Sequence, residues 1–294
     1  MVSQIKAAPA ENPPFDVTIA EEFITSSGLV ENLWLPTDRA KVPNLEAVYP
    51  WFYETRPAEA AKFGVPFGGG TCMLLLRNKL DLDGSTWKTM WSDKLANRIT
   101  LDGGTWYWPL SLPAVLNTSV PGLDEMYDIK TAEPLFAELE KIKVARWFAD
   151  GAEQANILNQ EEADAAVSYS SDAYTFLLSQ PGEYTASVPN EGTSGWTDWY
   201  FKVRGTQHGD LADLFLNFLL EKETQERFLA KSLIYTSRRD VTPPAHWNGA
   251  YPKDNADFYK RFQVLTMEGW GKMSTAWDAY DARAKAMIVK TTGG

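Results

Sequence analysis

The segment GWTDWY, residues 195–200, places a single carboxylate, Asp198, among three large aromatic side chains. Aromatic faces and a carboxylate both attract cations, so these residues could form a pocket for a positively charged ligand. A desolvated ammonium group needs a charge partner and hydrogen-bond acceptors, which an aspartate provides. The alternative is a strand end whose rings pack in the core and whose acid faces water.

Other kinds of chemistry have less support in the sequence. Cys72 is the only cysteine, so neither an intrachain disulfide nor a cysteine-based zinc site can form. The two histidines, His208 and His246, are too few for a histidine-rich metal centre. The glycines at 68–70 lack the Lys-Ser or Lys-Thr that follows in a phosphate-binding loop. We therefore expect no metal and no cofactor.

Composition narrows the range of partners. The 294 residues are 44% apolar and 23% charged, which is typical of a globular protein with room for two lobes. A formal net charge of −11 argues against nucleic acid as partner and modestly favours cationic solutes. No apolar run approaches the roughly 20 residues that span a bilayer, and the first residues lack the apolar middle of a secretory signal.

The elements that would position these residues alternate between strands and helices. Apolar runs predict strands at 15–19, 72–76, 165–169 and 196–203, and an extended segment at 29–34 after a turn that ends at Gly28. Helices are predicted at 210–220, at 172–179 with Asp172 as cap, after a Thr131 cap, and over 257–287. This alternation indicates an α/β sheet protein with ligands at strand ends.

The helix at 210–220 has the clearest pattern. Its apolar residues recur at the spacing of one helix face, with Asp210 as a possible cap: Leu211, Leu214, Phe215, Phe218 and Leu219.

Several stretches, in order, resemble the periplasmic solute-binding proteins of ABC importers, in particular the spermidine/putrescine group. They are FDVTIAEEFI, VPFGGGTCMLLLRN, AVSYSSDA, VPNEGTSGWTDWYFKV and ADLFLNFLLEKETQERF, and together they cover roughly residues 14–285. The resemblance implies an α/β, two-lobed type II periplasmic-binding-protein fold with two hinge-crossing strands, near 67–73 and 191–199. Lobe one would be 1–70 plus 200–294, and lobe two 71–199.

One departure from the family pattern concerns the start of the chain. The family begins with a strand and a helix before the segment that matches Phe15, and neither they nor a signal peptide are in this sequence. We therefore expect an N-terminally truncated lobe one.

The resemblance also implies binding residues. Trp196 and Asp198 match the family's aromatic and acid at the second crossing, and Tyr169 stands at the position of a stacking tryptophan. Asp102 keeps the first of two family acids, but Thr105 replaces the second, which permits a ligand with one positive end. The remaining candidates are Glu21, which could replace the lost acid, and the aromatic residues Phe23, Trp106 and Tyr235.

The function expected from this resemblance is an extracytoplasmic receptor, periplasmic and monomeric, that captures a small amine-bearing solute in the interlobe cleft. The solute would be a polyamine or an amino-acid-like or opine-like compound, delivered to a membrane permease. Two alternatives remain open: a ferric-ion receptor of the same fold, and an enzyme similar to thiaminase I that uses Cys72. An apolar run around Cys72 with no histidine near it indicates an inert thiol rather than a nucleophile.

Overall fold

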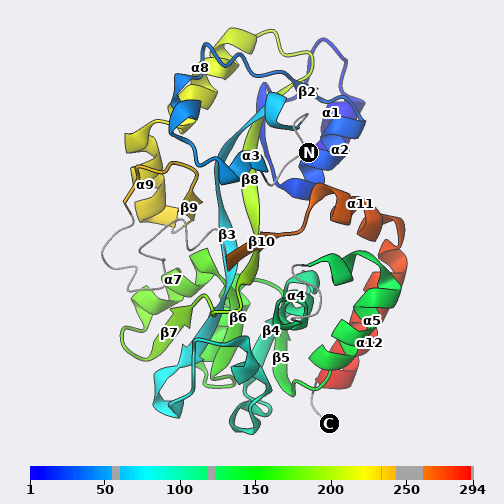
Figure 1. Ribbon diagram of the computed structural model, residues 1–294, viewed down its shortest axis with the longest axis vertical. Helices are drawn as coiled ribbons and strands as arrows, with labels where there is room; N and C mark the ends of the chain where they lie inside the picture. Colours follow the sequence, from blue (N-terminus) through cyan, green and yellow to red (C-terminus); the bar gives the residue numbers. More distant parts are fainter. Residues whose placement is uncertain (55–59, 118–122, 233, 243–260, 293–294) are drawn as a thin grey trace. The chain divides into compact units, whose positions relative to one another are not determined.

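The computed structural model describes residues 1–54, 60–117, 123–232, 234–242 and 261–292 (Figure 1). Contacts divide the chain into two units. Unit 1 is Met1–Gly70, Trp196–Ala245 and Val264–Gly271, and unit 2 is Thr71–Gly195, His246–Gln263 and Lys272–Gly294. The chain crosses from one unit to the other within strand β3 (Gly64–Arg77) and within strand β8 (Thr193–Val203).

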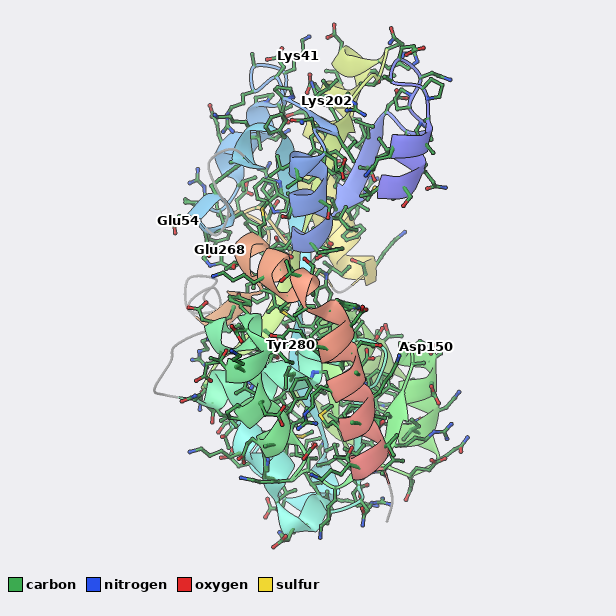
Figure 2. All side chains as sticks on the ribbon, turned by 90° about the vertical axis from the view of Figure 1, so that its right-hand side faces the viewer. Lys41, Glu54, Asp150, Lys202, Glu268 and Tyr280 are labelled. Atoms are coloured by element: carbon green, nitrogen blue, oxygen red, sulfur yellow. The ribbon has the colours of Figure 1, made fainter. Side chains whose placement is uncertain are left out.

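This division differs from the expected lobes at three places. Residues 196–199 of β8 belong to unit 1, and residues 246–263 and 272–294 belong to unit 2 rather than to the first lobe. The last difference has a physical cause in helix α12 (Trp277–Thr291), where the Tyr280 ring stacks on Trp106 at 5.6 Å and Arg283 is ion-paired with Glu133 at 2.8 Å (Figure 2 labels Tyr280).

The sheet of unit 1 is built on β8. Strand β1 (Val17–Ala20) and β2 (Trp34–Leu35) pair antiparallel with it, and β9 (Tyr235–Thr236) pairs with β3. Strand β10 (Phe262–Val264), whose first two residues belong to unit 2, also pairs with β8. The described helices of the unit are α1 (Val2–Ala7), α2 (Glu22–Val30), α3 (Trp51–Glu54), α8 (Gly209–Leu219), α9 (Lys222–Ser232) and α11 (Met267–Thr275). The last four residues of α11 belong to unit 2. Short 3₁₀ turns lie at Pro43–Ala47 and Ala60–Lys62.

The sheet of unit 2 is mixed. Strand β3 pairs antiparallel with β6 (Ala165–Tyr169) and β7 (Tyr184–Ser187), and β4 (Ile99–Asp102) pairs parallel with β6 and with β5 (Val144–Phe148). Its helices are α4 (Tyr107–Leu116), α5 (Ile129–Leu139), α6 (Gly151–Asn159), α7 (Ser170–Ser179) and α12, with 3₁₀ turns at Asn78–Leu80, Trp87–Trp91, Asp93–Leu95 and Asp124–Tyr127.

Several predicted boundaries are wrong for local reasons. Helix α2 continues past Gly28 to Val30, where an extended segment was expected from residue 29. Gly28 stands inside the helix because the Trp34 indole packs against it and leaves no space for a side chain. Asp128, not Thr131, caps α5 by accepting from the Lys130 amide at 2.8 Å. The long helix expected over 257–287 is interrupted: its first four residues lie outside the described residues, and α11 and α12 break at Ala276.

Helix α8 turns its apolar stripe outward. The residues it buries are Ala212, Asp213, Leu216 and Leu219, while Leu211, Leu214, Phe215 and Phe218 are exposed. The Asp213 carboxylate accepts from Lys202 Nζ at 2.7 Å and from the Asp38 amide at 3.2 Å, and both members of the ion pair are buried (Lys202 is labelled in Figure 2). This ion pair holds the helix in its orientation.

We expect Asp213→Ala to lower the free energy of unfolding by about 3–5 kcal/mol, because it leaves the Lys202 ammonium buried without a counter-charge. Urea titration followed by circular dichroism measures this loss. The matched control is Asp210→Ala on the same helix, which removes an exposed carboxylate and should leave the midpoint unchanged. Equal effects of the two substitutions would contradict the role given to the buried pair.

Candidate functional site

Strand β8 presents the GWTDWY residues to two opposite faces. Thr197, Trp199 and Phe201 are buried, whereas Trp196, Asp198 and Tyr200 are half-buried, as expected from the two-residue period of a strand. Of the rings around Asp198, that of Trp199 belongs to the core of unit 1, where it contacts Tyr53 edge-on at 5.8 Å. The other two rings share the face of the carboxylate.

The environment of this face is apolar and carries a negative charge. Burial raises the pKa of the Tyr200 phenol, and the charge of Asp198 raises it further. The Tyr200 ring also contacts the Phe67 ring in a T-shaped arrangement at 5.3 Å. A carboxylate flanked by partly desolvated rings is the combination that attracts an organic cation.

The glycines of β3 make room for this face. A Cβ atom at Gly70 would lie 2.2 Å from Cζ2 of Trp196, so the indole lies directly on the backbone of β3. A Cβ at Gly69 would lie 2.1 Å from the carbonyl oxygen of Trp196. The triple glycine thus serves close packing of strands rather than phosphate binding.

The acids at the start of α2 act inside unit 1. The Glu21 carboxylate caps the helix by accepting from the amides of Phe23 and Ile24 at 3.1 and 3.2 Å. The Glu22 carboxylate is buried and accepts from the amide of Thr197 at 3.0 Å and from its hydroxyl. Glu22 therefore fixes β8 at the residue between Trp196 and Asp198.

The other unit 1 candidates differ in exposure. Phe23 is partly exposed and its ring packs at 5.7 Å from that of Trp270. Tyr235 is buried in β9, paired with Gly69 of β3.

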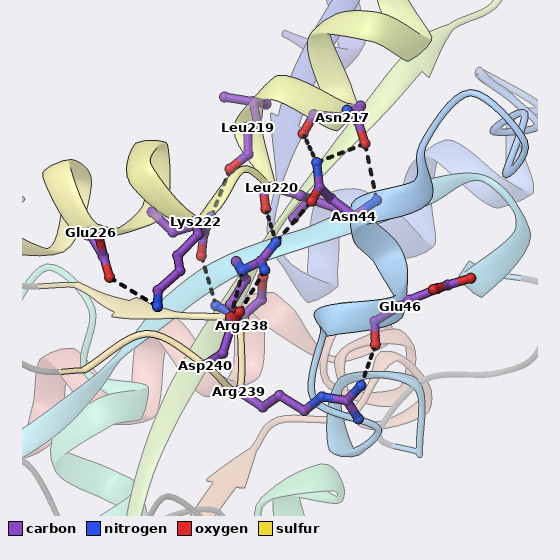
Figure 3. A network of polar contacts seen from close by, with 12 residues as sticks. Asn44, Glu46, Asn217, Leu219, Leu220, Lys222, Glu226, Arg238, Arg239 and Asp240 are labelled. Atoms are coloured by element: carbon purple, nitrogen blue, oxygen red, sulfur yellow. Dashed lines mark hydrogen bonds and ion pairs between the residues drawn. The ribbon is translucent and has the colours of Figure 1, made fainter.

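Arg238, which follows β9, is a structural residue (Figure 3). Its guanidinium binds Asp240 through two hydrogen bonds of 2.7 and 2.8 Å, and donates to the Leu220 carbonyl at 2.7 Å and to Asn44 at 3.0 Å. The same hydrogen bonds lower the pKa of the Asp240 carboxyl. These contacts tie together the ends of α8, β9 and the turn at Pro43–Ala47.

In unit 2, Asp102 is engaged by its own surroundings. Its buried carboxylate accepts from the amides of Gly104 and Thr105, both at 2.8 Å, from the Thr105 hydroxyl at 2.5 Å and from the Tyr169 hydroxyl at 2.6 Å. The threonine that replaces the second family acid is therefore a donor to the first. Asp102 orients Tyr169 at the end of β6.

Tyr169 keeps its proton near neutral pH. Burial raises the pKa of its phenol strongly, and the neighbouring charge of Asp102 raises it further. Its ring is half-buried, so part of it stays accessible. This geometry suits stacking and hydrogen bonding and does not suit a ligand that needs a phenolate.

Asp172 was predicted to cap a helix, and this is wrong: α7 begins two residues earlier, with Tyr169 at the N-cap position. Burial raises the pKa of the Asp172 carboxyl, and the charges of Asp102 and Asp150 add to the shift. A side chain at Gly151 would collide with this carboxylate, so the acid lies against the start of α6. No sequence pattern separates it from an ordinary first-turn acid.

Trp106 packs in the core of unit 2. It is buried and lies within 6.0 Å of the rings of Phe136, Trp277 and Tyr280. We therefore leave Trp106 out of the proposed site.

A pocket of about 500 Å³ in unit 2 lies apart from the predicted residues. It is lined by Lys88, Trp91, Pro113, Leu116, Asn117, Glu125, Pro134, Leu135 and Glu138. None of these residues is among those predicted from the sequence to bind a solute.

Cys72 is fully buried in β3, and burial raises the pKa of its thiol to about 12. Such a thiol is protonated at neutral pH and is a poor nucleophile. Within the described ranges, no group of His, Cys, Asp and Glu side chains could hold a metal ion. No described helix has the length and apolarity needed to cross a membrane.

Comparison with known proteins identifies the class. The model of a family described as bacterial extracellular solute-binding proteins matches residues 14–261, so the chain belongs to this family. A search of curated proteins finds no match. The two units together correspond to the two-lobed periplasmic-binding-protein fold of solved relatives.

Three of these solved structures span different ligands. The spermidine/putrescine substrate-binding protein PotD of Streptococcus pneumoniae is 22% identical, with a TM-score of 0.78 over 96% of this chain and 87% of that one. AgtB of A. tumefaciens R10, in complex with agropinic acid, is 18% identical, with a TM-score of 0.65 over 98% and 85%. Iron-bound HitA of Pseudomonas aeruginosa is 16% identical, with a TM-score of 0.68 over 97% and 86%. These likenesses establish the fold.

We expect Gly70→Ala to displace the Trp196 indole, because the added methyl would overlap it. The near-ultraviolet circular dichroism should change and the melting temperature should fall. Gly209→Ala is the control, since a Cβ there meets nothing within 4 Å. An unchanged aromatic spectrum for the variant at position 70 would show that the indole does not lie on β3.

We expect the Cys72 thiol of the folded protein to resist Ellman's reagent at pH 8, because a pKa of about 12 leaves roughly one thiolate in ten thousand. Full reaction should follow unfolding in guanidinium chloride. Rapid reaction of the folded protein would reopen the thiaminase-like alternative.

Proposed function

We propose that this protein is the extracytoplasmic solute receptor of an ABC importer and that its solute is a small organic compound with an amino group. The observation that carries the proposal is the face of β8 that presents Asp198 between Trp196 and Tyr200. Its carboxylate would neutralise the ammonium group, and the rings would cover the adjoining carbon atoms. The spermidine/putrescine protein and the agropinic acid complex among the neighbours are consistent with nitrogen-containing solutes.

Unit 2 would contribute Tyr169 and Asp172. The hydrogen bonds that Asp102 accepts leave it the role of holding the Tyr169 ring in place. Burial and the charges of Asp102 and Asp150 raise the pKa of the Asp172 carboxyl, so a cationic group placed beside it would stabilise its ionised form.

The mechanism we propose is capture without covalent chemistry. The solute is held in the interlobe cleft expected from the sequence, and its differential affinity favours the ligand-bound state. That state is then recognised by a membrane permease, which receives the solute.

Iron capture is the alternative that the fold permits, since HitA shares it. A ferric site built on Tyr169 would need to remove a strongly held phenol proton next to the Asp102 charge. Ferric–tyrosinate complexes absorb visible light, so adding ferric citrate and recording the visible spectrum separates the two functions.

A thermal-shift screen with diamines, spermidine, amino acids and opines tests the proposal. A solute at 100 times its dissociation constant should stabilise the protein by about 2.7 kcal/mol. Asp198→Asn should abolish the shift, whereas Asp81→Asn, the same charge change at an exposed turn, should preserve it. A shift that survives Asp198→Asn would contradict the role of this acid.

We expect Asp172→Asn to weaken amine binding and yet to stabilise the empty protein at pH 7. The sign follows from the pKa: a carboxyl whose folded pKa is raised costs stability when ionised, and the amide removes that charge. In the native protein, affinity should fall as acidification protonates Asp172, at a higher pH than for an ordinary aspartate. Titrations from pH 4 to 8 measure both effects; a variant that loses stability and affinity together would indicate a merely structural acid.

A further inference from the structure

Three oxygen atoms meet in unit 2 where strands β4 and β6 end. They are Oδ2 of Asp102, Oγ1 of Thr105 and the phenol oxygen of Tyr169. Oδ2 lies 2.5 Å from the Thr105 oxygen and 2.6 Å from the Tyr169 oxygen, and the two hydroxyl groups are also within hydrogen-bond distance of each other. The other carboxylate oxygen, Oδ1, accepts from the amides of Gly104 and Thr105 at 2.8 Å.

The direction of the Tyr169 hydrogen bond follows from counting protons. A carboxylate only accepts, whereas each hydroxyl group has one proton to donate. Two oxygen atoms 2.6 Å apart need a proton between them, and Tyr169 supplies it to the buried Asp102 carboxylate. The Thr105 proton serves either Asp102 or Tyr169, and in both cases the Tyr169 oxygen is left with acceptor capacity alone. Burial raises the pKa of the phenol, and the charge and hydrogen bond of Asp102 raise it further, so the proton stays in place near neutral pH.

We infer that Asp102 is a positioning residue that decides which solute groups Tyr169 can meet, namely groups that donate a hydrogen bond. This selection rests on the proposed function, in which Tyr169 contacts the solute. An ammonium group satisfies the Tyr169 oxygen. A carboxylate would set its lone pairs against those of the phenol and leave both groups without a hydrogen bond, which disfavours it.

The surrounding charges act in the same direction. Asp172 lies close enough to Asp102 and Asp150 for their charges to raise the pKa of its carboxyl. A solute carboxylate beside Tyr169 would therefore meet repulsion as well as a phenol that cannot donate. Among amine-bearing solutes, the compounds favoured at Tyr169 carry N–H or O–H groups there, and an amino acid that presents its carboxylate to Tyr169 is rejected.

The direction of the hydrogen bond can be measured without a solute. Subtracting the ultraviolet resonance Raman spectrum of Tyr169→Phe from that of the native protein isolates the Fermi doublet of this tyrosine. The intensity ratio of the doublet distinguishes a phenol that donates a strong hydrogen bond from one that accepts. We expect the donor pattern in the native protein and its loss when the same subtraction is made in an Asp102→Asn background. An acceptor pattern in the native protein would overturn the inference, whether or not an amine binds.

Isothermal titration with cadaverine and δ-aminovalerate tests the selection, because the two compounds have equal carbon chains and differ in one end group. The native protein should prefer the diamine, and Asp102→Asn should reduce that preference by about tenfold or more. The asparagine oxygen must keep the amides of Gly104 and Thr105, so its NH₂ group faces Tyr169 and releases the phenol proton for a carboxylate.

Two controls separate this effect from a simple change of charge. In a Tyr169→Phe background, Asp102→Asn should alter the preference much less, since the hydroxyl group is absent. Asp128→Asn should leave the preference unchanged, because Asp128 likewise accepts from an amide two residues on at 2.8 Å but caps α5. An equal effect of Asp102→Asn with and without the Tyr169 hydroxyl would overturn the inference and leave the proposed function intact. Failure of every amine to bind would contradict the proposed function, and the solute selection with it.

Discussion

The two-residue alternation of strand β8 decides which part of GWTDWY can meet a solute. Because Thr197 is held by the buried Glu22 carboxylate and Trp199 packs in the core, Asp198 must share the opposite face with Trp196 and Tyr200. A one-residue slip of the strand would bury the carboxylate and expose the core tryptophan. The pairing of β8 with β1, the glycines of β3 and the Glu22 contact all oppose that slip.

Four acids of this protein hold the local fold. Glu21, Glu22, Asp102 and Asp213 accept defined hydrogen bonds from their own unit, so their charges stabilise local structure. The charged form of Asp172 is instead disfavoured, because burial and the neighbouring acids raise the pKa of its carboxyl. In the function we propose, a cationic solute would offset the repulsion between Asp172 and its neighbouring acids.

The sequence predicted the fold class, the strand at 165–169 and most of α8. It could do so because the spacing of apolar residues differs between strands and helices. It could not predict which way α8 faces, since that depends on an ion pair with a residue eleven positions away. It placed Trp106 among the binding candidates because residue type alone does not reveal a packed ring cluster. The raised pKa of Asp172 depends on burial and on the charges of Asp102 and Asp150, which no local pattern encodes.

If an ammonium group is what this receptor holds, removing the positive charge from a bound solute must remove the affinity. Isothermal titration with the most stabilising amine and with its analogue bearing a hydroxyl in place of the amino group measures this directly. We predict at least a tenfold weaker affinity for the analogue, or about 1.4 kcal/mol, and no such difference in Asp198→Asn. Equal affinity of the native protein for the two compounds would contradict the account.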